Sequence, residues 1–103
     1  MYEICSMSIL IVSSTEMEAA PFRSEFPEAS CLITGVGMPM AIFQLTKKIQ
    51  EQNYDVIFQV GIAGTYTNDL HLGEAVVVAK DCFADLGLYE GNSFHTIFVA
   101  RWN

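Results

Sequence analysis

The stretch Asp55-Val56-Ile57-Phe58-Gln59-Val60-Gly61-Ile62-Ala63-Gly64 (residues 55–64) decides the fold that we predict for this chain. Residues 55–60 form an almost continuous apolar run, which is typical of a parallel strand buried on both faces. Two glycines follow at positions 61 and 64, and glycine lets backbone approach a ligand closely. The stretch therefore predicts a central strand that ends in a ligand-binding loop.

Similar signals repeat on both sides of this stretch. The predicted strands are residues 9–12, 31–34, 55–60, 75–79 and 94–100. Residues 39–52 carry apolar side chains at helical spacing, and an earlier helix is predicted within residues 16–26. Pro21 fits either the first position of that earlier helix or a disturbed second turn. Strands that alternate with helices imply right-handed crossovers and a largely parallel α/β sheet.

Composition excludes several classes of partner. The formal net charge is −7, with 12 acidic and five basic residues, so the chain has no basic surface for nucleic acid or an anionic membrane. The three cysteines, Cys5, Cys31 and Cys82, have neither disulfide-framework nor zinc-site spacing. No apolar run reaches membrane-spanning length. We therefore expect reduced thiols and a cytoplasmic location.

The candidate site lies where the predicted strands end, because ligands of open α/β sheets bind beyond the carboxyl ends of the strands. Segments 13–18, 35–38 and 61–66 should converge there. None of them is a dinucleotide fingerprint or a phosphate loop. Glu18 is placed to activate a water molecule. Alternatively, Thr15 and Glu18 match a capping box, in which the carboxylate only holds the helix start. The glycines allow both readings too, as ligand loops or plain turns.

Taken in order, the motifs resemble the nucleoside phosphorylase and nucleosidase superfamily. The motifs are ILIV with a following E-x-E (9–18), TGVGM (34–38), DVIFQVGIAG (55–64) and LHLGEAVVV (70–78). The stretch Asp81–Glu90 is similar to futalosine hydrolases, which act in menaquinone biosynthesis. The resemblance implies a three-layer αβα fold with a largely parallel or mixed central sheet. It also implies that residues 1–103 are one truncated domain whose second half is missing.

The resemblance also implies roles for individual residues. Glu18 would be the catalytic, water-activating base. The substrate-binding positions would be Val36, Gly37, Gly61, Ile62, Ala63 and Gly64. No metal or other cofactor is implied. Related phosphorylases carry a phosphate-binding arginine in the loop after the first strand, and the absence of arginine from residues 13–18 favours hydrolysis.

The function that follows is hydrolysis of the N-glycosidic bond of a purine-type nucleoside. The alternatives are an enzyme like methylthioadenosine/S-adenosylhomocysteine nucleosidase, or an inactive fragment or nucleoside-binding domain. In the family, a ribose-binding glutamate and a base-protonating aspartate lie in the second half of the fold, which this sequence does not contain. We therefore expect impaired activity, a small-molecule nucleoside as partner, and a homo-oligomer.

Overall fold

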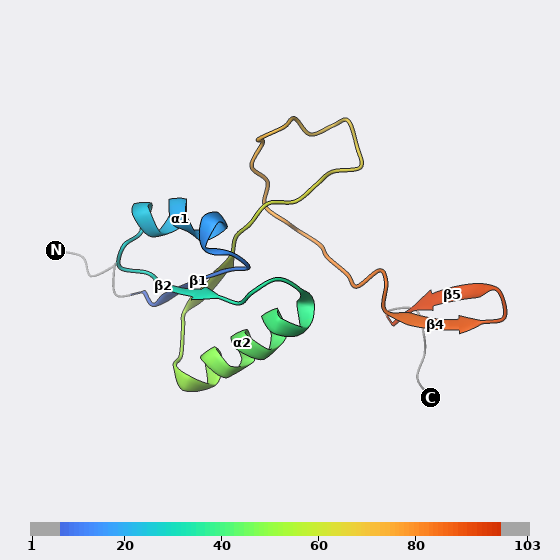
Figure 1. The fold of residues 1–103 in the computed structure, drawn as a ribbon, viewed down its shortest axis with the longest axis horizontal. Coiled ribbons are helices and arrows are strands. Elements are labelled where there is room, and N and C mark those ends of the chain that lie inside the picture. Colours follow the sequence, from blue (N-terminus) through green and yellow to red (C-terminus); the bar gives the residue numbers. More distant parts are fainter. Residues whose placement is uncertain (1–6, 98–103) are drawn as a thin grey trace. The chain divides into compact units, whose positions relative to one another are not determined.

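A computed structural model describes residues 7–97 of the chain. The chain divides into two compact units, and the boundary along the sequence falls between Thr65 and Tyr66. The elements are β1 (Ile9–Ser13), α1 (Glu16–Glu25), β2 (Ser30–Ile33), α2 (Met38–Glu51), β3 (Val56–Gln59), β4 (Gly87–Glu90) and β5 (Ser93–Thr96). The first unit holds β1 to β3 with both helices, and the second holds β4 and β5 (Figure 1). Across residues 7–97, none of the helices has the length and apolar character needed to cross a membrane.

The first unit is built on a parallel sheet with the strand order β2-β1-β3. Ile11 is in register with Cys31 on one side and with Phe58 on the other. The predicted parallel α/β core is confirmed, but the prediction that residues 55–60 form the central strand is wrong for this sheet. The run in β1 is the one enclosed by neighbours, since Leu10 is fully buried while Phe58 in β3 keeps 54% of its surface exposed.

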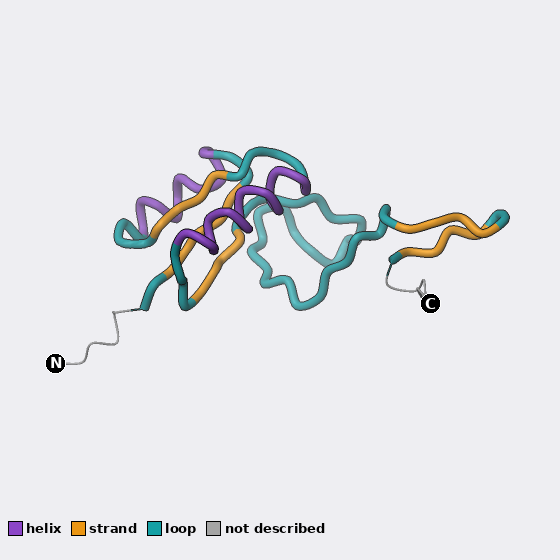
Figure 2. Tube along the Cα trace, turned by 90° about the horizontal axis from the view of Figure 1, so that it is seen from below, coloured by secondary structure: helices purple, strands orange, loops and turns teal. Residues whose placement is uncertain are grey.

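The two helices lie beside this sheet in Figure 1 and Figure 2, but they contact it unequally. In α1, Pro21 lies inside the helix, so the reading of Pro21 as the first helical residue is wrong. This helix contacts β1 and β2, and its Ala19 is fully buried. In contrast, α2 follows the predicted 39–52 closely but buries none of its residues. The mixed α/β class is therefore established, whereas the three-layer arrangement stays a prediction.

The predicted fourth strand, residues 75–79, does not form within the part of the chain that the structure describes. Its valines are exposed instead, with 96% of the surface of Val77 accessible. A strand needs a neighbour for its backbone N–H and C=O groups, and the described ladders include none for this segment. An apolar, β-branched run is therefore not sufficient to make a strand.

The predicted fifth strand, residues 94–100, is right in part. Residues 93–96 form β5, which pairs antiparallel with β4, and positions 98–100 lie outside the described residues. The sequence prediction missed β4. The signal that was overlooked is the pair Gly91-Asn92 between two short runs, which is a two-residue hairpin turn. Tyr89 and Phe94 face each other across the hairpin, with ring centroids 5.0 Å apart.

A stability prediction follows from the burial of β1. Leu10→Ala should lower the free energy of unfolding of the first unit by about 2–4 kcal/mol, because it removes a buried side chain and leaves a cavity. Met17→Ala is the control within the same unit, since its side chain is 80% exposed and should change stability by less than about 0.5 kcal/mol. Urea denaturation followed by circular dichroism measures both. Equal effects of the two substitutions would contradict the assigned core.

Candidate active site

Polar groups gather where the parallel strands of the first unit end. The buried polar residues among those described are Ser13, the last residue of β1, and Thr34, which directly follows β2. The Thr34 amide donates to the Ser13 carbonyl over 2.9 Å, and the Thr34 hydroxyl donates to the Gly35 carbonyl over 2.8 Å. Ser13 Oγ is buried without a hydrogen-bond partner among residues 7–97. This edge is therefore where the unit tolerates buried polarity, as a ligand site requires.

The Glu18 carboxylate lies at the same edge and is held by two donors. Its Oε1 accepts from the Thr15 hydroxyl over 2.8 Å, and its Oε2 accepts from the Ile62 amide over 3.0 Å. Thr15 belongs to the turn after β1, whereas Ile62 belongs to the glycine loop after β3. Two of the three predicted segments, 13–18 and 61–66, are thus joined by this one side chain.

The contacts of Thr15 and Glu18 differ from those of a standard capping box. Thr15 is the N-cap of α1, and its hydroxyl oxygen accepts from the Glu18 amide over 3.3 Å. In a full capping box the glutamate would accept from the Thr15 backbone amide. Here the carboxylate accepts from the Thr15 hydroxyl and reaches across to Ile62 instead. The Glu18 carboxylate is therefore oriented toward the loop after β3 and does not accept from the Thr15 backbone amide as in a capping box.

The other predicted substrate-binding positions are not joined to Glu18 by the contacts that the structure describes for residues 7–97. Gly35 and Gly37 have positive φ values of 86° and 102°, which L side chains rarely adopt, and Gly37 caps α2. This geometry explains both glycines as parts of a strand-to-helix turn. Among the described residues, no hydrogen bond joins Val36, 78% exposed, or Gly37 to Glu18. Ala63 and Gly64 are also exposed. Their substrate-binding role stays a prediction.

The basic residue of α1, Arg23, is paired within its own helix. Its guanidinium donates to the Glu16 carboxylate. A hydrogen bond to Cys31, together with the charges of Cys31 and Glu16, raises the pKa of Arg23 above its ordinary value, although desolvation acts in the opposite direction. Arg23 is thus paired with Glu16, whereas the contacts of Glu18 among residues 7–97 are to Thr15 and Ile62.

Comparison with known proteins identifies one relevant relative. The chain is 34% identical over 94 residues to the futalosine hydrolase of Thermus thermophilus. The chain is a homologue of part of this futalosine hydrolase. The match covers 80% of this chain but only 41% of the relative, which is consistent with a match to its N-terminal part. No family model matches the chain, and no solved structure matches it significantly.

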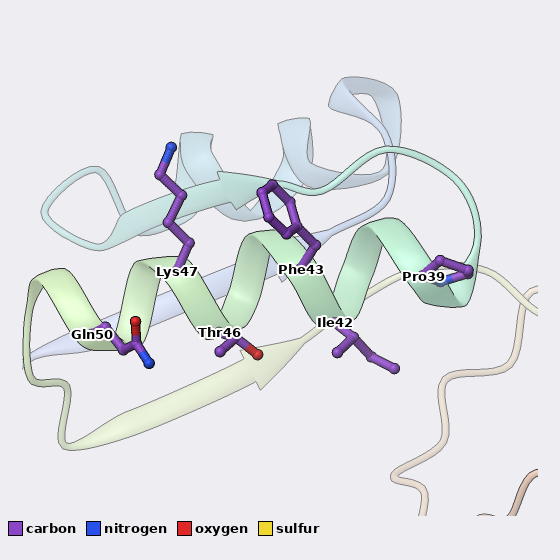
Figure 3. A pocket seen from close by; sticks show the side chains of 6 residues that line it. All are labelled: Pro39, Ile42, Phe43, Thr46, Lys47 and Gln50. Atoms are coloured by element: carbon purple, nitrogen blue, oxygen red, sulfur yellow. The ribbon is translucent and has the colours of Figure 1, made fainter.

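Two hollows in the first unit are lined by residues other than Glu18. One, of about 530 Å³, runs along α2 and is wide open; Figure 3 shows its lining residues, Pro39, Ile42, Phe43, Thr46, Lys47 and Gln50. The other, of about 210 Å³, is lined only by apolar residues: Ile9, Ile11, Phe22, Phe26, Ala29, Phe58 and Val60. The first is an open surface whose polar side chains, Thr46, Lys47 and Gln50, all come from one helix, and the second has no polar lining, whereas a ligand pocket is concave with a few polar groups inside it. The candidate site is therefore the Glu18 edge, not these hollows.

One contact of the candidate site was missed by the sequence prediction. Thr15 was considered only as a helix cap, yet its hydroxyl also donates to the Glu18 carboxylate. The signal was present, because the T-x-x-E spacing places both side chains on the first turn of a helix. Among residues 7–97, no group of three potential metal ligands occurs.

Proposed function

We propose that this chain supplies the water-activating half of a nucleosidase site that hydrolyses the N-glycosidic bond of a purine-type nucleoside such as futalosine. The observation that carries the proposal is the Glu18 carboxylate, held at the carboxyl edge of a parallel sheet by Thr15 and Ile62. The homology to a futalosine hydrolase supports the same reaction class and a place in menaquinone biosynthesis. A cytoplasmic location remains part of this proposal.

The proposed step uses Glu18 as a general base. One carboxylate oxygen takes a proton from water while the water oxygen forms a bond to the anomeric carbon of the ribose. The bond from that carbon to the base nitrogen breaks, and the base leaves with the bonding electrons. The departing nitrogen gains a proton from an acid that the resemblance places in the part of the fold beyond this sequence. The transition state is oxocarbenium-like, by analogy with glycoside hydrolysis.

The carboxylate has room for this task. An ionised carboxylate offers about four acceptor positions, and Thr15 and Ile62 occupy one on each oxygen. A water molecule can therefore donate a hydrogen bond to one of the remaining positions of the carboxylate without breaking either contact. The loop residues Val36, Gly37 and Gly61 to Gly64 are proposed to lie beside ribose and base. Release of free base from futalosine, by a protein that also carries the rest of the relative's length, tests the proposal.

The chain spans 41% of the length of its futalosine hydrolase relative, and this favours a second candidate function. We propose that the chain alone binds nucleoside weakly without turning it over, because the resemblance places the ribose-binding glutamate and the acid elsewhere. A nucleosidase acting on methylthioadenosine or S-adenosylhomocysteine is the remaining alternative. Assays with those nucleosides beside futalosine separate it from the first proposal.

We also propose that the chain self-associates. Large apolar side chains are exposed in both units, including Phe43 and Phe58 in the first and the run Val76 to Val78 in the second. An exposed, uncharged β-branched run is a template for pairing between chains. Sedimentation velocity at increasing concentration should therefore show species larger than the monomer. A stable monomer at high concentration would contradict this proposal.

A pair of lysine substitutions tests whether the valine run drives association. Val77→Lys places a charge inside the run and should shift the population toward monomer. Tyr66→Lys is the matched control, because Tyr66 is as fully exposed as Val77 but lies outside the run. Equal shifts for both variants would assign the effect to net charge and would remove the run from the proposal.

A further inference from the structure

Both oxygens of Glu18 are held by groups from loops far apart in sequence. Thr15 lies three residues away and Ile62 forty-four residues away, and each donates to a different oxygen. A carboxylate on a three-bond side chain has rotamer freedom that a single hydrogen bond would leave largely intact. Two donors on opposite oxygens fix both the position and the plane of the carboxylate. Such fixing is what a general base needs, because its proton transfer depends on geometry.

The approach of the loop to Glu18 is possible because position 61 is glycine. A Cβ atom at Gly61 would lie 2.5 Å from Glu18 Oε2 and 3.7 Å from its carboxyl carbon. The shorter distance is well inside van der Waals contact, so the carboxylate or the loop would have to move. Gly64, in the same loop, has open space around its would-be Cβ, with nothing within 4 Å. Neither glycine has a positive φ, so the two differ in this close approach and not in backbone strain.

We propose that Gly61 and Thr15 are positioning residues for Glu18. Because position 61 has no side chain, the Glu18 carboxylate can reach the Ile62 amide. The Thr15 hydroxyl holds the other carboxylate oxygen at the start of α1. Their catalytic importance rests on the proposed function, but the geometry they impose is testable in this chain without any turnover. Gly61 then has a role distinct from contacting a substrate, because it sets the distance between the Glu18 carboxylate and the loop after β3.

Thr15 serves as helix cap and as donor to Glu18, and two substitutions separate these roles. Thr15→Ser keeps the hydroxyl, so it keeps both the cap and the donor. Thr15→Asp keeps a good cap acceptor for the Glu18 amide, but an ionised carboxylate cannot donate to Glu18 Oε1. If Thr15 acts only as a cap, the two variants should behave alike. If it positions Glu18, only Thr15→Asp should disturb the contact with Ile62.

Amide hydrogen exchange of Ile62, measured by NMR on the full chain, reads out the contact directly. Glu18→Ala, Gly61→Ala and Thr15→Asp should each speed the exchange of the Ile62 amide by about 3- to 10-fold, as the loss of one hydrogen bond implies. Gly64→Ala and Thr15→Ser should leave it within about 2-fold of the parent chain, well below the loss of a hydrogen bond. Unchanged exchange in Gly61→Ala overturns the role of Gly61, and unchanged exchange in Thr15→Asp overturns that of Thr15.

This readout is independent of the proposed reaction. If Ile62 exchange responds as expected while a full-length chimera does not cleave nucleosides, the positioning geometry stands and the proposed function fails. If the chimera is active but Gly61→Ala leaves the exchange rate of the Ile62 amide unchanged, the function stands and the positioning proposal fails. In an active chimera, Gly61→Ala should lower kcat more than it changes KM, because it misplaces the base rather than the substrate.

Discussion

Joining this chain to the part of the Thermus thermophilus futalosine hydrolase that it does not span should turn a protein without measurable turnover into one that cleaves futalosine. Protonation of the leaving base alone accounts for about 10²- to 10⁴-fold in rate. Positioning of the ribose against the water adds up to roughly 7–11 kcal/mol of barrier lowering. The Glu18 edge supplies neither of these, so the chain alone should lie near the uncatalysed rate. Release of free base, followed by chromatography, measures both proteins.

The comparison of the chain with the chimera needs a control for folding, because the first unit carries large exposed apolar side chains. Ile62 amide exchange in the chain alone provides it, since protection shows that Glu18 is already held. A protected Ile62 amide with no turnover assigns the missing rate to the absent groups. Robust futalosine cleavage by the chain alone would show that the acid and the ribose clamp lie within these 103 residues.

The sequence predicted the parts of the fold that depend on local pattern. Residues 9–13, 30–33 and 56–59 form parallel strands because each apolar run is followed by a turn and a helix or loop. The order of the strands was not predictable in the same way. The run at 9–12 is wholly apolar, whereas 55–60 includes Asp55 and Gln59, and which of them becomes central also depends on the direction of the two crossovers.

The failure at residues 75–79 has a different cause. Whether a valine run becomes a strand depends on a partner at long range, and periodicity carries no information about that partner. The convergence at the site shows the opposite case. That segments 13–18 and 61–66 would meet followed from parallel strands ending at one edge, but the donor to each Glu18 oxygen required coordinates. Sequence thus located the edge, and geometry assigned Thr15 and Ile62 their contacts.

In the active chimera, Glu18→Gln should lower kcat by about 10²- to 10⁴-fold, the contribution expected of a general base. The substitution is nearly isosteric. The amide oxygen can accept from Ile62, and the amide nitrogen can face the Thr15 hydroxyl, which is able to accept as well as donate. The side chain should therefore stay in place while losing its ability to take a proton from water. Steady-state kinetics with futalosine measures the loss, and KM should change little.

Ile62 exchange makes this result specific to proton transfer. Glu18→Gln should keep the Ile62 amide protected, whereas Glu18→Asp should expose it, because the shorter side chain withdraws from the loop by about one carbon–carbon bond. Both variants should be slow, for different reasons: the first holds its position without basicity, and the second keeps basicity without its position. Full turnover in Glu18→Gln would place the base elsewhere. Full turnover in Glu18→Asp would show that the contact with Ile62 does not matter for the reaction.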